Sequence, residues 1–497
     1  MALSVFNYRS FVLGEVMVQL DQRVRFKSAT SIISIEMWER FSFYGMQALL
    51  VYYLYFDVAA GGLGLDQTQA TGLVGVYGAL LYLCCWAGGW VSDRVLGAEK
   101  TLLGGAISVT IGHLVLAGLG GKIGLAIGLG CIAIGSGFVK TAAITVLGSR
   151  HGEQEGDAKA DPAFQLFYLG INVGALLGPL LTGWLSSRYS FEMGFGAAAV
   201  LMIGGLGIYA ALRKPMLQSF PLEVKKALLR AQNPAEKHVI STAFAAVAVL
   251  CGVLLYLLLT ETVSADQLAG ALLLVTIGAA LWLIIQPLRH PQVSSEEKRK
   301  VLAFIPIFVC STAFWAVQAQ TYGVLAVYSQ ERVDRMVGDF EIPAAWSQSL
   351  NPFFILALSI PISLWFMRGS RAPRVKIGIS IGVIIAGSGL LVLIPFVGMP
   401  LAPVWVLPLS VFLISLGELF IGPGGMAATA HHAPRIFATR FSALYFLTLA
   451  IGMSIAGNVS KFYDPTNHTS ELRYFAVFGI SIIVIGVGSL MVAKKVG

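Results

Sequence analysis

The stretch "EMWERFSFYG", residues 36–45, places two glutamates and one arginine inside an otherwise apolar and aromatic segment. On a surface helix such a cluster would need no explanation. The composition of the chain argues against a surface helix, because 56% of its 497 residues are apolar and only 12% are charged. Soluble domains carry about a quarter charged residues. The composition therefore indicates a protein that crosses the bilayer many times, which makes the lipid bilayer its first expected partner.

Fourteen apolar runs are long enough to span a bilayer as helices, at about 20 residues each. A net charge of +8 is also typical of proteins that bind nucleic acid, but here the basic residues lie in the loops between the spans. With the N-terminus placed in the cytoplasm, 26 of the 34 lysines and arginines fall in cytoplasmic segments and 6 in outer loops. Missing one span would invert every later loop, so this alternation supports the count. The runs start near residues 31, 67, 101, 122, 163, 192, 237, 268, 301, 342, 375, 402, 436 and 474.

The span pattern divides the chain into two halves. It predicts an all-α polytopic membrane protein with a cytoplasmic N-terminal segment (1–30) and a six-helix bundle (31–213). Linkers and two additional spans follow (214–300), and then a second six-helix bundle (301–497). The stretch "GGWVSDRVLGAEK" (88–100) resembles the cytoplasmic loop signature of the major facilitator superfamily. Two six-helix bundles around a midplane site are the architecture on which alternating access depends.

Five ionisable residues are predicted inside the spans: Glu36, Glu39, Arg40, Lys140 and Glu418. Each is costly at the centre of a bilayer, so the default expectation is a functional role in a cavity. A buried pair that only locks two helices is the plainer alternative, and it is serious for Arg40, which can pair with Glu36 one turn away. Three carboxylates and two cations leave a net charge of −1. A bound proton or a cationic group of a substrate would neutralise it, and a cavity that takes both would couple protons to a solute.

Several segments resemble motifs of the proton-dependent oligopeptide transporters, a family of the major facilitator superfamily. "EMWERFSFYG" resembles the ExxERF-x-YYG motif of that family, and "FYLGINVGA" (167–175) is similar to its FYxxINxGS signature. "GSGFVK" (135–140), "QSLNP" (348–352) and "GELFIGPGG" (417–425) resemble its motifs on the fourth, eighth and tenth core helices. The resemblance also covers the number of spans, since bacterial members of this family have fourteen. From the residues alone, we also expect the helix to break at the Gly-Pro-Gly-Gly after Glu418 and at the proline of "QSLNPFF".

The resemblance implies roles for individual residues. Glu36, Glu39, Arg40 and Lys140 would handle protons, and Glu418 would bind the N-terminal ammonium of a peptide. No catalytic residue, metal site or cofactor is expected, and the chain is expected to act as a monomer. The implied substrate contacts are Tyr44, Gln47, Tyr82, Lys140, Asn172, Trp315, Gln348, Asn351 and Glu418.

Three positions depart from the family pattern. Phe43 stands where the family usually has tyrosine, Gln47 where it has arginine, and Ala319 where it has an acidic residue. In the family that arginine and that acid pair across the outer gate. Losing both avoids a stranded buried charge, so the gate is expected to close by apolar packing or neutral hydrogen bonds. It also leaves Lys140 as the main partner for a peptide carboxylate, which suggests a preference for dipeptides.

The resulting hypothesis is a proton-coupled symporter that imports di- and tripeptides into the cell across the plasma membrane, with both termini cytoplasmic. Alternatives with the same fold are a carrier of nitrate or another small anion, and a drug exporter driven by proton antiport. A sensor or scaffold that does not transport belongs to another class. A carboxylate at Glu418 disfavours anions, and counterflow would distinguish a transporter from a sensor. No nucleophile–base pair or phosphate-binding loop indicates an enzyme.

Overall fold

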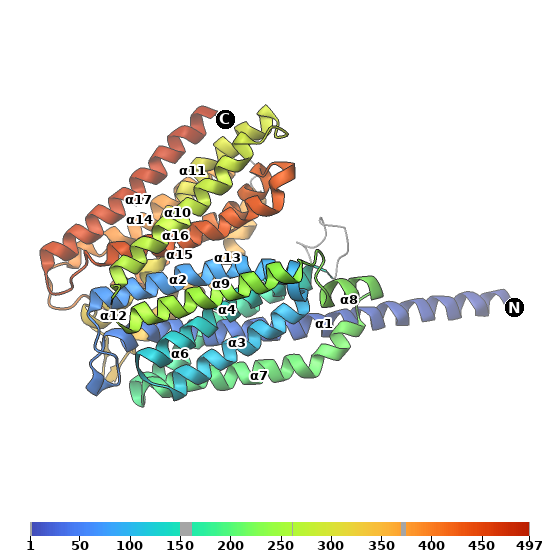
Figure 1. Ribbon diagram of the computed structural model, residues 1–497, viewed down its shortest axis with the longest axis horizontal. Coiled ribbons are helices and arrows are strands. Elements are labelled where there is room, and N and C mark those ends of the chain that lie inside the picture. Colours follow the sequence, from blue (N-terminus) through green and yellow to red (C-terminus); the bar gives the residue numbers. More distant parts are fainter. Residues whose placement is uncertain (1, 150–161, 261, 369–373, 497) are drawn as a thin grey trace.

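The computed structural model describes residues 2–149, 162–260, 262–368 and 374–496. Three of the 26 basic residues in the predicted cytoplasmic segments lie outside these ranges: Arg150, Lys159 and Arg371. The described chain is built almost entirely from helices, with one two-stranded hairpin (Figure 1). Eleven of its helices are long and apolar enough to cross a membrane, as judged by length and composition.

The first helical bundle contains six long helices that pack on one another, and α1 contacts both α6 and α7. The helix α1 begins at Ala2, so the predicted boundary at residue 30 corresponds to no break in the backbone. The bundle consists of α1 (Ala2–Tyr55), α2 (Gln67–Val91), α3 (Ala98–Gly118), α4 (Gly121–Gly148), α6 (Pro162–Arg188) and α7 (Phe191–Gln218), with single turns at η1 (Val58–Ala60) and η2 (Ser92–Leu96).

The inserted segment forms a short helix and a helical hairpin. The hairpin helix α10 packs against α2 of the first bundle and α16 of the second, and α9 touches α4. The elements are α8 (Leu222–Leu229), α9 (Lys237–Leu259) and α10 (Ala265–Arg289).

The second bundle contains six long helices, the first of which breaks and continues as a short helix. It comprises α11 (Ser295–Gln318), η3 (Ala319–Tyr322), α12 (Val324–Glu331), η4 (Ala344–Ser349), α13 (Leu350–Arg368), α14 (Arg374–Leu391), η5 (Ile394–Phe396), α15 (Val406–His432), η6 (Arg435–Phe437), α16 (Ala438–Ser460) and α17 (His468–Val496). Strands β1 (Met336–Val337) and β2 (Phe340–Glu341) pair antiparallel before η4.

Capping residues explain where two helices begin. Ser264 and Ser294 are followed three positions later by Gln267 and Glu297, the pattern of a capping box. Each serine hydroxyl accepts a hydrogen bond from the backbone N–H three residues on, at 3.2 Å in both cases. The side chains of Gln267 and Glu297 accept the serine N–H groups in return, both at 3.0 Å. The second box starts α11 at Ser295, so the predicted boundary at residue 300 lies inside that helix.

The expected break after Glu418 is wrong, because α15 runs without interruption through Pro423 to His432. Proline removes one helical hydrogen bond, but the helix tolerates the loss here among flanking glycines. In "QSLNPFF", Pro352 lies in the first turn of α13, where its missing N–H would have no helical partner in any case.

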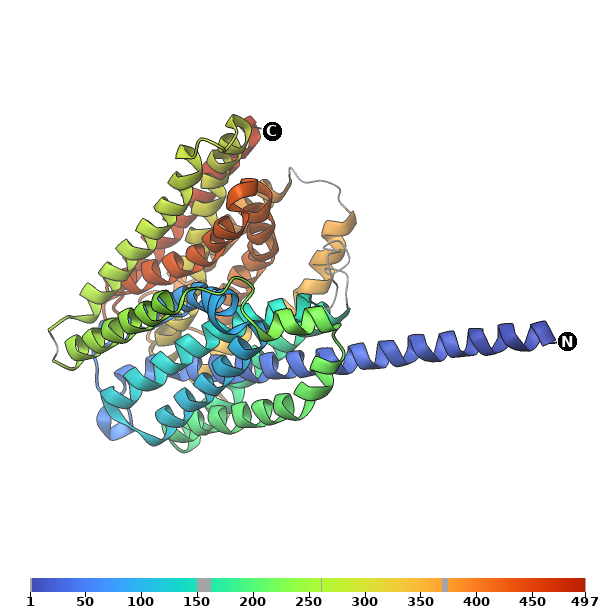
Figure 2. The same ribbon diagram turned by 45° about the vertical axis from the view of Figure 1, so that its right-hand side comes forward.

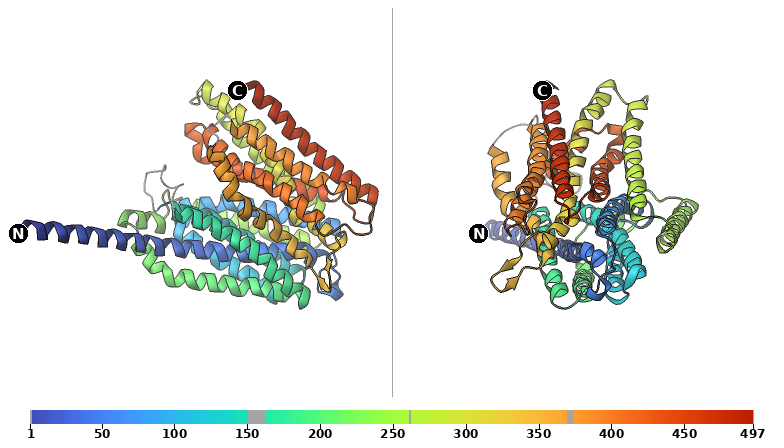
Figure 3. Two further views of the ribbon diagram at one scale, coloured as in Figure 1. Left: turned by 180° about the vertical axis from the view of Figure 1, so that it is seen from behind. Right: turned by 90° about the vertical axis from the view of Figure 1, so that its left-hand side faces the viewer.

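The two bundles meet at one end and diverge toward the other (Figures 1 and 2). We call these the contact end, which carries residues 56–66, 332–349 and 461–467, and the divergent end, which carries α8 and both chain termini (Figure 3). Among the described residues, four hydrogen bonds join the bundles at the contact end. Tyr52 donates to Ala326 O (2.9 Å), Tyr55 to Glu331 Oε1 (2.9 Å), Trp346 Nε1 to Leu180 O (2.9 Å) and Ser349 Oγ to Leu176 O (2.7 Å).

Close packing of α2 on α16 adds a further link between the bundles. Gly75 lies so near Gly457 that a Cβ atom added at Gly75 would be 2.6 Å from the Cα of Gly457. Glycine permits such close approach of two helix backbones inside a membrane.

The outward face of α17 shows why the bundle suits a lipid environment. Val477, Ile480, Val484, Val487 and Met491 recur at three- and four-residue spacing and are all between 41% and 65% exposed. An apolar stripe of this kind is stable against hydrocarbon and costly in water.

Two further buried carboxylates were absent from the set predicted from the sequence. Glu99, at the start of α3, accepts bonds from Arg213 Nε (2.5 Å) and Nη2 (2.9 Å) and from Tyr209 (3.1 Å). Glu471, at the start of α17, accepts a bond from Arg332 Nε at 3.1 Å. Each lies at a helix end beside an arginine, so these pairs leave the charge balance of the interior unchanged.

We expect Arg213→Met to destabilise the protein by about 3 kcal/mol, because the buried Glu99 carboxylate would lose its cation. The apparent melting temperature in detergent should fall by several degrees. The matched control is Lys226→Met, which breaks the exposed pair with Glu223 (2.9 Å) and should cost less than about 1 kcal/mol. Equal shifts for the two variants would show that the buried pair contributes no more than a surface pair.

Candidate functional site

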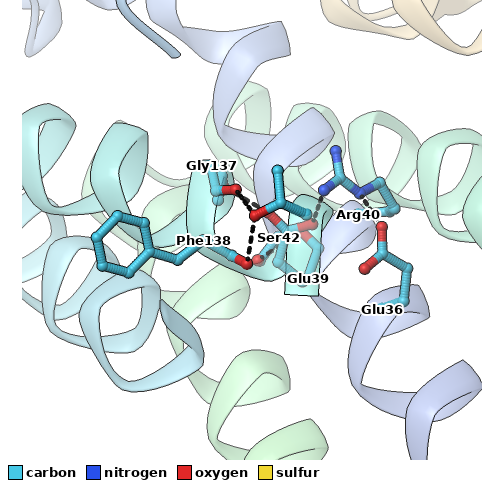
Figure 4. A network of polar contacts seen from close by, with 8 residues as sticks. Glu36, Glu39, Arg40, Ser42, Gly137 and Phe138 are labelled. Carbon is cyan, nitrogen blue, oxygen red and sulfur yellow. Dashed lines mark hydrogen bonds and ion pairs between the residues drawn. The ribbon is translucent and has the colours of Figure 1, made fainter. Parts of the chain in front are cut away.

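The first bundle carries a compact ionic cluster on α1. Arg40 Nε lies 3.0 Å from Glu36 Oε1 one turn away, and Arg40 Nη2 lies 2.6 Å from Glu39 Oε2. Figure 4 shows the guanidinium between the two carboxylates. All three side chains are at most 3% exposed. One arginine therefore neutralises one of two buried carboxylates, and the cluster keeps a net charge of −1.

Helix α4 contributes a second group to this cluster. Ser136 Oγ donates a hydrogen bond to Glu39 Oε1. Lys140 follows one turn later on α4, and its Nζ lies 4.8 Å from the ring centre of Tyr82 and 5.6 Å from that of Phe43. Among the described residues no carboxylate lies within ion-pair distance of Lys140. Its ammonium is held by cation–π contacts, which leaves its N–H groups free for an anionic ligand.

The second bundle places a carboxylate with neutral partners. Asn351 Nδ2 donates to Glu418 Oε2 at 2.8 Å and to Ser415 Oγ at 3.0 Å. No cation in the described ranges lies within ion-pair distance of Glu418. Glu418 itself is half-buried, and Ser415, Gly417 and Ile421 around it on α15 are buried. A carboxylate in this setting can accept a proton or bind a cationic group.

Several tyrosine side chains lie within electrostatic range of charged groups of both bundles. Tyr44 lies within electrostatic range of both Arg40 and Glu418. Tyr322, from η3, lies within electrostatic range of Tyr44, Tyr82 and Glu418. Since Tyr82 also contacts Lys140, this set links the charged groups of the two bundles electrostatically.

The structure places the other predicted ligands at the margins of this region. Asn172 donates to the carbonyl of Tyr168 on its own helix (2.9 Å), and Gln348 Nε2 donates to Thr321 O (2.6 Å). Trp315 packs edge-on against Phe314, and its indole N–H is buried without an acceptor in the described chain. Within the described part of the chain, these three side chains form no hydrogen bond with the charged groups.

Four residues near the charged groups were missed from the sequence. Ser136 precedes Lys140 by four positions and Ser415 precedes Glu418 by three, so helical spacing alone could have indicated both. Tyr322 lies on a short 3-10 turn, and Tyr445 of α16 lies within electrostatic range of Glu418 and Tyr82. Neither tyrosine has a local pattern that would have singled it out.

Comparison with known proteins identifies the family. The model of the POT family matches residues 99–480, and the chain belongs to this family. It is 35% identical to the uncharacterized transporter YclF of Bacillus subtilis (strain 168), over 93% of this chain and 92% of that protein. It is 31% identical to the di-/tripeptide transporter of Lactococcus lactis subsp. cremoris, over 94% and 95%.

Solved structures of POT family transporters are also similar to this chain. A crystal structure of the peptide transporter POT in complex with sulfate has a TM-score of 0.87 at 33% identity, and the match covers 96% of this chain and 98% of that one. The predicted fold is thereby confirmed: two six-helix bundles of the major facilitator superfamily with an inserted helical hairpin.

Two of the positions that differ from the family pattern, Gln47 and Ala319, lie toward the contact end and are both buried. Ala319 is buried against Ala79, Met453 and Ala456, an apolar cluster at the junction of the bundles. Gln47 on α1 is 3% exposed, and its amide oxygen has no partner among the described residues. Apolar packing and neutral groups thus occupy the positions where the family pattern has an ion pair.

Restoring the ion pair gives a stability test of this replacement. We expect Gln47→Arg or Ala319→Asp alone to lower the apparent melting temperature by several degrees, because each strands a buried charge. The double variant should recover at least about 1 kcal/mol of the summed loss, since the charges compensate each other. Strictly additive shifts would show that the two positions do not pair.

Proposed function

We propose that this protein imports di- and tripeptides by proton symport. The observation that carries the proposal is the pairing pattern of the interior charges. Among the residues that the structure describes, Lys140 of the first bundle has no carboxylate partner and Glu418 of the second bundle has no cationic partner. A zwitterionic peptide supplies both missing charges, with its carboxylate at Lys140 and its ammonium at Glu418. Relatives named as peptide transporters support this assignment.

The α1 cluster supplies a proton site in this proposal. When Glu36 and Glu39 are both ionised, they compete for Arg40, and Lys140 lies within electrostatic range of both. Protonation of Glu39 removes one negative charge near Lys140 and leaves this ammonium free to bind the peptide carboxylate. Deprotonation after release restores the attraction. Uptake of a peptide is thereby linked to entry of a proton.

Orientation follows from the distribution of basic residues. Loops at the divergent end carry most of the lysines and arginines, which supports a cytoplasmic location for this end and for both termini. The described conformation then faces inward. The exposure of Tyr168 supports this orientation, because this residue is 52% exposed and lies within electrostatic range of Glu418. The protein acts at the cell membrane as a monomer.

Uptake into proteoliposomes tests the function directly. Under an imposed inward proton gradient, dialanine should accumulate above its outside concentration, and an uncoupler should reduce accumulation to equilibration. Unlabelled dialanine should compete, whereas nitrate should not. Competition by nitrate would favour an anion carrier, faster export at low outside pH would favour antiport, and absence of counterflow would indicate a sensor.

Peptide length gives a separate check on the substrate class. Because Gln47 replaces a cation, Lys140 is the main group available to the peptide carboxylate, which favours one fixed distance between the two peptide ends. We expect dialanine to compete for uptake at least several-fold better than tetraalanine, with trialanine between them. Equal competition by tetraalanine would contradict this preference.

A further inference from the structure

A cavity lies between the bundles near the contact end, and none of the interior charged residues of the candidate site lines it. Its volume is about 330 Å³, and nearly all of its wall is hydrocarbon. The first bundle contributes Leu176 and Leu180 of α6, and the second contributes Leu350 and Phe353 of α13 and Leu407 of α15. No polar group of the ionic cluster described above lines it. The remaining lining residues are Ser329, Val333, Arg335, Ile342, Pro343, Trp346, Ser347, Ser349, Val404 and Pro408.

The cavity depends on the meeting of the two bundles. Two of the hydrogen bonds that join the bundles border it, Trp346 Nε1 to Leu180 O and Ser349 Oγ to Leu176 O. If the bundles separated at this end, its two walls would part. An occupant would therefore favour the conformation in which the contact end is closed.

The side of the cavity borders the apolar exterior of the helices. Phe353 is 52% exposed and Val404 is 36% exposed, and Leu181 beside the α6 wall is 37% exposed. Aromatic residues at this end of the bundle, Trp184 and Trp405, are 43% and 54% exposed. Exposed tryptophans are typical of the level at which lipid headgroups begin.

One charged residue, Arg335, lines the cavity in the described chain. It donates from Nη1 to Ile342 O (2.8 Å) and from Nη2 to Glu341 (2.8 Å), while its Nε has no acceptor among the described residues. Glu341 neutralises the guanidinium charge, but the Nε donor remains available to a phosphate oxygen, so the site suits an amphiphile that has a phosphate head and an apolar tail.

We propose that this cavity holds one acyl chain of a bilayer phospholipid, with the lipid phosphate at Arg335. The site is separate from the peptide site and requires no assumption about transport. Water is a poor occupant, because the wall offers almost no polar groups to hold it.

Trp346 lines the cavity and reports its occupant. The full-length protein is reconstituted in phosphatidylcholine brominated in the middle of its acyl chain, and the Trp346 signal is taken as the wild type minus Trp346→Phe. We expect this signal to be quenched by more than half. Leu180→Phe, which fills the cavity, should reduce the quenching at least twofold, whereas Leu181→Phe, one residue away and outside it, should not. Equal quenching in both leucine variants, or none in the wild type, would overturn the proposal.

A separate experiment tests the contact between Arg335 and the lipid phosphate. Brominated phosphatidylcholine should quench Trp346 at least threefold more effectively than brominated diacylglycerol in the wild type. Arg335→Gln should remove this preference, and Arg188→Gln, at an exposed arginine of α6, should keep it. An unchanged preference in Arg335→Gln would show that Arg335 does not bind the phosphate.

Discussion

Glu39→Gln is expected to abolish uphill uptake of dialanine while exchange of dialanine across the membrane continues. Glutamine keeps the shape of the side chain and can still contact Ser136 and Arg40, but it cannot bind and release a proton. Exchange needs only peptide binding and movement of the bundles, whereas uphill uptake also needs the proton. We expect concentrative uptake to fall at least tenfold and counterflow to stay within threefold of the wild type.

A matched control separates loss of coupling from general damage. Glu223→Gln alters an exposed carboxylate of α8 and should leave both assays unchanged. If Glu39→Gln still accumulates dialanine to the wild-type level under a proton gradient, the assignment of Glu39 to proton coupling is wrong. If it loses counterflow as well, Glu39 contributes to folding or to peptide binding instead.

Glu418→Gln is expected to weaken dialanine binding by roughly 30- to 1,000-fold, as follows from losing one partner of a buried charge pair, at about 2–4 kcal/mol. The amide keeps a hydrogen-bond acceptor for Asn351, so local structure should survive. Binding is measured with purified protein by calorimetry, beside a melting curve that reports folding.

Asn351→Ala is the comparison variant for Glu418→Gln, and a smaller effect is expected from it. It removes one neutral donor to Glu418 without removing the charge, so it should change the affinity by no more than about tenfold. A folded Glu418→Gln protein that binds dialanine as tightly as the wild type would contradict the role given to Glu418.

The helical architecture was largely predictable because each bilayer span must be long and apolar, and because basic residues mark alternate loops. Helix termini were less predictable. The run predicted near residue 342 begins as a 3-10 turn and becomes α-helix only at Leu350. The Gly-Pro-Gly-Gly segment was expected to break α15, yet local sequence does not reveal how neighbouring helices accommodate a proline.

The charged residues of the site were predictable for a similar reason, since an ionisable side chain inside a span is rare and costly. Their partners were harder to predict. The cation–π contacts of Lys140 and the position of Tyr322 depend on how separate helices pack. Glu99 and Glu471 were missed because each lies at the edge of an apolar run, where burial depends on the bundle rather than on the run itself.

The central claim is that one peptide is held between Lys140 and Glu418, and blocking its ends one at a time tests this most directly. Binding of dialanine, its N-acetyl derivative and its C-terminal amide is compared for the wild type, Lys140→Gln and Glu418→Gln. The wild type should bind dialanine far more tightly than either blocked form. Glu418→Gln should no longer discriminate against the N-acetyl form but should still discriminate against the amide, and Lys140→Gln should do the reverse. The claim would be contradicted if both variants kept the wild-type preference for each free end.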